Sequence, residues 1–79
     1  MALKTSARNQ LPGVVTAVRL GNVMAQVEIQ VGENRIVAAI TRDAVVELDL
    51  KEADRVVAII KATEVMVGKL DGAEASGGA

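Results

Sequence analysis

The feature that most limits this chain is the kind of apolar residue it contains. Hydrophobic residues make up 51% of the 79 residues, yet none is Phe, Trp, Tyr or Cys, so a core has to be built from small and medium aliphatic side chains and Met. A chain of this length forms one domain at most and buries only about 60% of the surface that its unfolded form exposes. Disulfides cannot add stability, and with no histidine a zinc site is nearly excluded. We therefore expect a homo-oligomer that buries aliphatic faces between its subunits.

Several functional classes are excluded or disfavoured by composition. A net charge of −1 gives no field that attracts nucleic acid, and the missing aromatic residues remove the stacking platforms of single-strand binders. No apolar stretch matches a signal peptide or the roughly 20 residues of a membrane span. Without His or Cys, nucleophilic catalysis of the usual kinds is closed, and the acidic side chains of residues 47–54 are expected to form a solvated cluster. We expect a cytoplasmic binding protein that is no enzyme and binds neither nucleic acid nor membrane.

Runs of Val and Ile separated by turn residues predict successive β-strands. Gly21 and Asn22 predict a hairpin between the first two strands, and a second turn is expected at residues 32–34. In the second strand, apolar residues alternate with Met24, Gln26, Glu28 and Gln30, which indicates one face against a core and one mostly wet face. The predicted strands are residues 14–20, 23–31, 35–41 and 55–61, the last being a nearly continuous apolar run expected to be the most buried segment.

The region between the third and fourth strands breaks this pattern. Asp43 can cap a helix, and Val45 and Leu48 are three residues apart, so one short helical turn is predicted, with another strand as the alternative. Residues 63–67 either extend the fourth strand or form a fifth. The expected fold is all-β, a small five-stranded barrel of the oligonucleotide/oligosaccharide-binding (OB) type with one helical turn, with half of a β-sandwich as the alternative. The domain is predicted to span residues 1–68, followed by a disordered tail at residues 69–79.

Two short polar segments stand apart from the aliphatic strands. Ser6, Ala7, Arg8 and Asn9 offer a hydroxyl, a guanidinium, an amide and backbone N–H groups, with no carboxylate among them. Lys61, Ala62 and Thr63 add an ammonium and a second hydroxyl, and strand alternation would place Lys61 and Thr63 on one face. Such donor sets suit a tetrahedral oxyanion, but isolated charges on a small barrel are also ordinary surface polarity. Because the chain is too small for a deep pocket, we expect Arg8 and Lys61 to meet across a subunit interface.

The sequence resembles the molbindins, small molybdate- and tungstate-binding proteins that share the Mop domain. The paired order of the two polar segments makes this likeness specific. The residues that carry it are Thr5-Ser6-Ala7-Arg8-Asn9-Gln10-Leu11-Pro12-Gly13, Gly21-Asn22-Val23-Met24-Ala25-Gln26-Val27, Ile40-Thr41, residues 47–50 and Lys61-Ala62-Thr63-Glu64-Val65-Met66-Val67-Gly68.

The resemblance implies an OB-like barrel assembled as a hexamer, a trimer of dimers, with molybdate or tungstate held at subunit interfaces. It further implies an oxyanion site built from Ser6, Ala7, Arg8, Asn9, Thr41, Lys61, Ala62 and Thr63, and a possible second site at Gly21, Asn22 and Val23. The implied role is intracellular molybdenum storage or homeostasis; the alternative is an oxyanion-sensing module that acts through a protein partner.

Two positions depart from the family pattern. Ala44 stands where relatives commonly carry a serine, which removes one hydroxyl donor. Glu64 stands where a small hydroxyl residue is frequent, and strand alternation would turn its carboxylate away from Thr63. Both changes bear on affinity and on the number of occupied sites.

Overall fold

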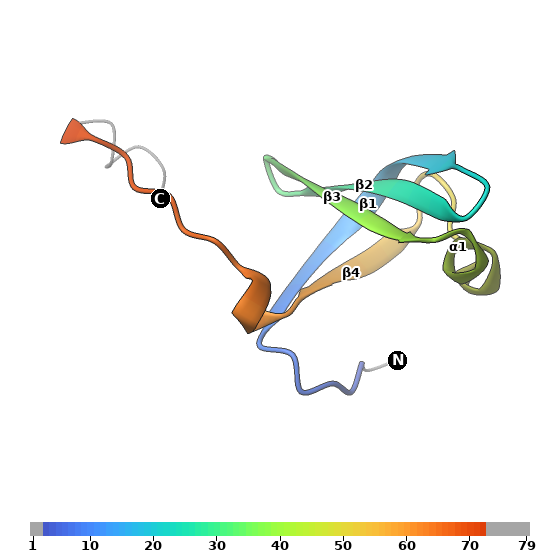
Figure 1. The fold of residues 1–79 in the computed structure, drawn as a ribbon, viewed down its shortest axis with the longest axis horizontal. Helices are drawn as coiled ribbons and strands as arrows, with labels where there is room; N and C mark the ends of the chain where they lie inside the picture. Colours follow the sequence, from blue (N-terminus) through green and yellow to red (C-terminus); the bar gives the residue numbers. More distant parts are fainter. Residues whose placement is uncertain (1–2, 73–79) are drawn as a thin grey trace.

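The computed structural model describes residues 3–72 as one curved sheet with a short helix at one end (Figure 1). Four antiparallel strands lie in the order β3-β2-β1-β4. No helix in this part of the chain is long and apolar enough to cross a membrane. The elements in chain order are β1 (Asn9–Leu20), β2 (Met24–Val31), β3 (Asn34–Thr41), α1 (Arg42–Leu48), β4 (Arg55–Ile60) and the 3-10 turn η1 (Ala62–Glu64).

The long strand β1 joins the two halves of the sheet. Its first half pairs with β4, from Asn9 opposite Ile60 to Val14 opposite Arg55, and its second half pairs with β2. The strand bends where the pairing changes, because the register shifts between Val15 and Ala17. Gly13 permits the close approach at this bend, since a Cβ there would lie 2.5 Å from the carbonyl oxygen of Gln30. The bend curls the sheet around its core.

The two predicted hairpins are confirmed. The backbone N–H of Gly21 donates to the carbonyl of Met24 at 2.8 Å and closes the first turn. Gly32 has a φ of 57°, a conformation that favours glycine, and lies in the turn between Val31 and Asn34, which pair directly. The three consecutive strands therefore form a meander.

Helix α1 confirms the predicted helical turn and excludes a strand there, but its cap was predicted wrongly. Thr41, not Asp43, is the N-cap: its Oγ1 accepts a hydrogen bond from the Ala44 N–H at 3.1 Å. The last residue of β3 already has the extended backbone that an N-cap requires, with φ −73° and ψ 151°, so the strand passes directly into the helix. Asp43 lies inside the first turn instead.

The core is thin, as the aliphatic composition suggested. Among the described residues the buried apolar side chains are Val15, Ala25, Val27, Ile29, Val45 and Ala58. Strand β4, predicted to be the most buried segment, contributes only Ala58, so that prediction is wrong. The physical reason is its position: β4 is an edge strand that pairs with β1 alone, and its Val57 and Ile59 side chains are exposed. Continuous apolar sequence does not distinguish burial within a chain from burial between chains.

One charged residue is buried on the face of β2 that the alternation pattern predicted to be mostly exposed to solvent. Glu28 is 8% exposed and accepts hydrogen bonds from Arg19 at 3.0 Å and from Arg35 at 3.3 Å. Because β2 lies between β1 and β3, one arginine reaches Glu28 from each neighbouring strand. Both arginines keep most of their own side chains in solvent. We interpret these two ion pairs as structural contacts that connect the three strands.

The predicted fifth strand is absent from the described chain. Residues 62–64 form η1, and residues 65–70 extend away from the sheet without strand pairing (Figure 1). Strands β3 and β4 therefore remain the two open edges of the sheet, and the barrel is not closed. Of the predicted tail, residues 69–72 are described and are exposed, whereas residues 73–79 lie outside the described residues. Met1 and Ala2 also lie outside them.

Candidate oxyanion-binding site

The two polar segments lie side by side at one end of the sheet. Asn9 and Ile60 form the last pair of residues between β1 and β4, and the Asn9 Nδ2 donates to the Ile60 carbonyl at 3.1 Å. Arg8 precedes this pair and Lys61 follows it, so both cations flank the same point of the sheet. The pairing of β1 with β4 thus brings the two segments together within one chain, whereas from the sequence we expected Arg8 and Lys61 to meet across a subunit interface.

Most donors in these segments are not used by the fold. Within residues 3–72, the side chains of Ser6, Arg8, Lys61 and Thr63 are exposed and make no hydrogen bond or ion pair. An exposed guanidinium and an exposed ammonium beside two hydroxyl groups are free to turn toward an anion. The end of the sheet near Asn9 and Ile60 is therefore the part of the described chain best supplied with donors that have no structural role.

The other two residues of the first segment, Ala7 and Asn9, already make hydrogen bonds within the fold. The Ala7 N–H donates to Thr5 Oγ1 at 3.1 Å, and the Ala7 carbonyl accepts from Gln10 Nε2 at 2.8 Å. An anion that uses the Ala7 N–H must replace the Thr5 oxygen. Asn9 uses one amide N–H to hold β4, so its side chain positions the two segments as well as offering its second N–H.

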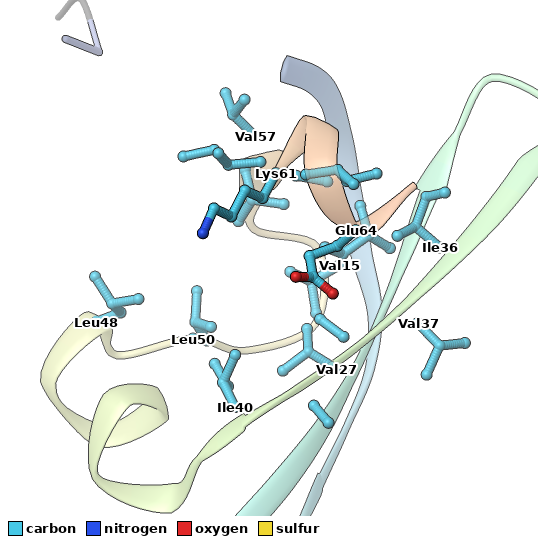
Figure 2. A pocket seen from close by; sticks show the side chains of 17 residues that line it. Val15, Val27, Ile36, Val37, Ile40, Leu48, Leu50, Val57, Lys61 and Glu64 are labelled. Carbon is cyan, nitrogen blue, oxygen red and sulfur yellow. The ribbon is translucent and has the colours of Figure 1, made fainter. Parts of the chain in front are cut away.

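The 3-10 turn changes how the second segment presents its side chains. Strand alternation does not hold at residues 62–64, so the prediction that Lys61 and Thr63 share a strand face is wrong, as is the prediction that Glu64 points away on that basis. Lys61 and Glu64 are three residues apart across a helical turn and line the same groove (Figure 2). The Glu64 carboxylate therefore lies on the same side of the turn as Lys61. Its negative charge lowers the net positive charge beside the Lys61 ammonium.

Thr41 and the residues of the possible second site lie at the opposite end of the sheet. Thr41 pairs with Met24, and the Arg42 N–H donates to the Val23 carbonyl at 2.8 Å. The Arg42 guanidinium donates to the Gly21 carbonyl at 3.0 Å. Within one chain Thr41 therefore joins the turn at residues 21–23, not the end that carries Arg8 and Lys61.

Arg42 is the residue that sequence reasoning missed at this second end. Apart from Arg35, it is the only lysine or arginine in residues 20–50. Its position directly after Thr41 was the signal available in the sequence. Its guanidinium is already engaged by a backbone carbonyl, and the Thr41 hydroxyl caps α1. The polar groups at this end largely hold the turn and the helix in place.

Two acidic residues of the loop before β4, Asp49 and Asp54, have structural partners. Asp54 Oδ2 accepts from the Lys51 N–H at 3.0 Å, and Asp49 pairs with the Lys51 ammonium at 2.9 Å. The hydrogen bond from Lys51 to Asp49, together with the charge of that carboxylate, raises the pKa of Lys51. Within residues 3–72 no group of three or more His, Cys, Asp or Glu side chains is arranged to hold a metal ion.

Comparison with known proteins agrees with this geometry. The family model of the TOBE domain matches residues 5–67. The chain belongs to the TOBE-domain family. The match begins just before Ser6 and ends after Thr63, so it contains both polar segments of the candidate site.

Curated relatives connect the family to molybdenum. The chain is 41% identical over 66 residues to molybdenum-pterin-binding protein 1 of Clostridium pasteurianum, which covers 82% of this chain and 97% of the relative. It is 45% identical over 67 residues to a probable molybdenum-pterin-binding protein of Haemophilus influenzae, with 84% and 97% covered. It is 43% identical over 68 residues to the molybdenum transport protein ModE of Azotobacter vinelandii, covering 85% of this chain but only 25% of that longer protein.

Two solved structures share the TOBE fold of this chain. A molybdate-binding protein from Sporomusa ovata superposes with a TM-score of 0.81 at 43% identity, covering 85% of this chain and all of that one. MopII from Clostridium pasteurianum superposes with a TM-score of 0.77 at 42% identity, covering 81% and 97%. The resemblance to the Mop-domain molbindins and the small all-β, OB-like fold class are confirmed.

Proposed function

We propose that this chain binds molybdate and holds it without chemical change, as a molybdenum storage or homeostasis protein. The observation that carries the proposal is the pairing of Asn9 with Ile60, which brings the chain at Arg8 and Lys61 to the same end of the sheet, together with donors that the fold leaves unused. The names of the relatives support molybdate as the ligand, since two are molybdenum-pterin-binding proteins and one solved structure is a molybdate-binding protein.

The donor set suits a fully deprotonated tetrahedral anion. The expected ligands from the first segment are Ser6, Ala7, Arg8 and Asn9, and those from the second are Lys61, Ala62 and Thr63. Arg8 and Lys61 together supply the two positive charges that neutralise a dianion. Molybdate at neutral pH offers oxygens that only accept hydrogen bonds, whereas phosphate near neutral pH also carries a proton that needs an acceptor. A site rich in donors therefore favours molybdate, and tungstate of the same charge and geometry is expected to bind as well.

Assembly into a homo-oligomer completes this proposal. Within residues 3–72, the exposed large apolar side chains outnumber the buried ones, and they include Val57 and Ile59 of edge strand β4. Contacts between copies would bury them, in a hexamer built as a trimer of dimers in the cytoplasm. Thr41 lies at the far end of its own sheet, so it enters the Arg8–Lys61 site only from another subunit. Any contribution of Thr41 to oxyanion binding would therefore depend on assembly.

The second candidate function is an oxyanion sensor that acts through a protein partner. The observation in its favour is the ModE relative, in which a match to this chain occupies only a quarter of a longer transport protein. A sensor of this kind transmits occupancy to attached or bound partners. A store has no need to do so.

Titration calorimetry with molybdate, tungstate, sulfate and phosphate tests the proposal. Molybdate and tungstate are expected to bind measurably and the other two anions more weakly. If neither molybdate nor tungstate binds the assembled protein, the storage function is wrong. Binding to a stable monomer with unchanged affinity would refute the dependence on assembly alone.

A further inference from the structure

Glu64 places a carboxylate among the donors of the proposed oxyanion site. It is the last residue of η1, and its backbone N–H donates to the Lys61 carbonyl at 2.9 Å. Side chains three residues apart in a 3-10 turn lie on the same side of the turn, whereas a continued strand would turn them to opposite faces. The turn therefore fixes the Glu64 side chain on the side of Lys61.

The surroundings of these two side chains strengthen the effect of their charges. Lys61 and Glu64 reach over a groove that is lined by residues of β3 and β4 (Figure 2). Among the described residues that line this groove they are the only charged ones, and all the others are aliphatic. Within residues 3–72 neither the Lys61 ammonium nor the Glu64 carboxylate forms an ion pair. Charges beside an apolar wall are screened less than charges in bulk water, so the carboxylate acts on an anion that binds at Lys61.

The charges at this end of the sheet do not balance a doubly charged anion. Arg8 and Lys61 carry one positive charge each and together would match the two negative charges of molybdate, but Glu64 cancels one of the positive charges. A doubly charged oxyanion is then left with an uncompensated negative charge, whereas a singly charged one is balanced. Shape does not make this distinction, because perrhenate is a tetrahedral oxyanion like molybdate and carries a single negative charge.

We propose that Glu64 sets the charge selectivity of the oxyanion site. Its carboxylate weakens the binding of doubly charged oxyanions and reduces the preference of the site for them over singly charged ones. This inference deepens the proposed function and rests on it, because it requires an anion bound at Arg8 and Lys61. Glu64 thus differs from the donors around it, since it opposes the anion that they attract. A store has to release its anion as well as hold it, and a fixed opposing charge favours release.

Coulomb's law gives this proposal a quantitative signature. The interaction energy is proportional to the product of the charges, so Glu64 shifts the logarithm of the dissociation constant twice as far for a dianion as for a monoanion at the same position. Removal of the carboxylate charge is expected to tighten molybdate binding roughly tenfold and perrhenate binding roughly threefold. A substitution that acts through shape alone changes both dissociation constants by the same factor. The ratio of the two changes therefore separates an electrostatic role from a structural one.

Three variants of the full chain test the proposal. Glu64→Gln keeps the size of the side chain and removes its charge, whereas Glu64→Asp keeps the charge on a shorter side chain. The matched control Glu52→Gln removes the same charge from the exposed loop before β4, at the strand end away from Lys61. Titration calorimetry at constant pH and ionic strength measures molybdate directly and perrhenate by displacement of molybdate. Glu64→Gln is expected to show the tenfold and threefold gains, and the other two variants changes below about twofold.

The outcomes distinguish this inference from the proposed function. Equal gains in Glu64→Gln and Glu52→Gln would mean that only the net charge of the protein matters, and equal gains for molybdate and perrhenate would mean that the substitution acts through shape. Either result overturns the charge selectivity. A Glu64→Gln variant that binds molybdate no more tightly than the wild type overturns the role of Glu64 and leaves molybdate binding standing. A wild-type chain that binds neither molybdate nor tungstate overturns both.

Discussion

The two ends of the sheet carry similar polar residues but use them differently. At the end marked by Asn9 and Ile60, Arg8 and Lys61 are exposed and have no partner within residues 3–72. At the other end, Arg42 is bonded to the Gly21 carbonyl and the Thr41 hydroxyl caps α1. A donor that already stabilises the fold loses a bond when it turns to a ligand. The comparison therefore favours the first end for the proposed anion binding and gives the polar groups of the second end a structural role.

The largest effect is expected from Arg8→Ala. Loss of a charged hydrogen bond costs about 1.5 to 3 kcal/mol, so the molybdate dissociation constant should rise roughly ten- to 150-fold. Calorimetry on Arg8→Ala and on the control Arg55→Ala measures this. Arg55 is also exposed but starts β4, at the strand end away from Lys61, so its removal should leave affinity nearly unchanged. Equal losses in the two variants would mean that only net charge matters.

Thr41→Val tests the second end. The substitution keeps the shape of the side chain and removes the N-cap oxygen, which should lower the free energy of unfolding by about 1 kcal/mol. Denaturant unfolding and molybdate titration are to be measured on the same assembled protein. The comparison predicts lower stability with little change in affinity. A loss of affinity without loss of stability would make Thr41 an anion ligand supplied by a neighbouring subunit.

Asn9→Ala is expected to change both the stability of the fold and the affinity for molybdate at the first end. Its side-chain amide holds the Ile60 carbonyl, so the loss should cost about 0.5 to 1.5 kcal/mol of stability. Because this hydrogen bond also holds the two polar segments together, the affinity for molybdate should fall as well. The control Asn9→Gln keeps the amide group but places it on a longer side chain. Weaker binding with unchanged stability would indicate that Asn9 acts only as a ligand.

Arg42→Ala should have the smallest effect. Its hydrogen bond to the Gly21 carbonyl is exposed to solvent, so its loss should change the unfolding free energy by less than about 1 kcal/mol. If the turn at residues 21–23 holds a second anion, stoichiometry measured by calorimetry should fall in this variant while the affinity of the first site stays constant. Unchanged stoichiometry would restrict the oxyanion to the Arg8–Lys61 end.

Local patterns predicted much of the fold because the turns and strands are set by short-range chemistry. Gly21 with Asn22 and Gly32 with its neighbours place the hairpins correctly, and the alternation of β2 identifies Ala25, Val27 and Ile29 as core. The same reasoning failed where the environment of a strand matters. It could not recognise β4 as an edge strand, and it did not foresee two arginines closing over Glu28 from neighbouring strands.

The sequence by itself determined the inventory of the candidate site: which donors exist, and that residues 6–9 and 61–63 carry them. Tertiary structure alone decided their arrangement. Pairing of β1 with β4 brings Arg8 to Lys61 across some fifty residues of chain, and η1 turns Glu64 to the side of Lys61 where strand alternation would have separated them. Sequence spacing carries no information about which end of a sheet a residue reaches, so it could not show that Thr41 lies at the end opposite to Arg8 and Lys61 within one chain. Composition determined which donors the chain has, and strand pairing determined where they lie.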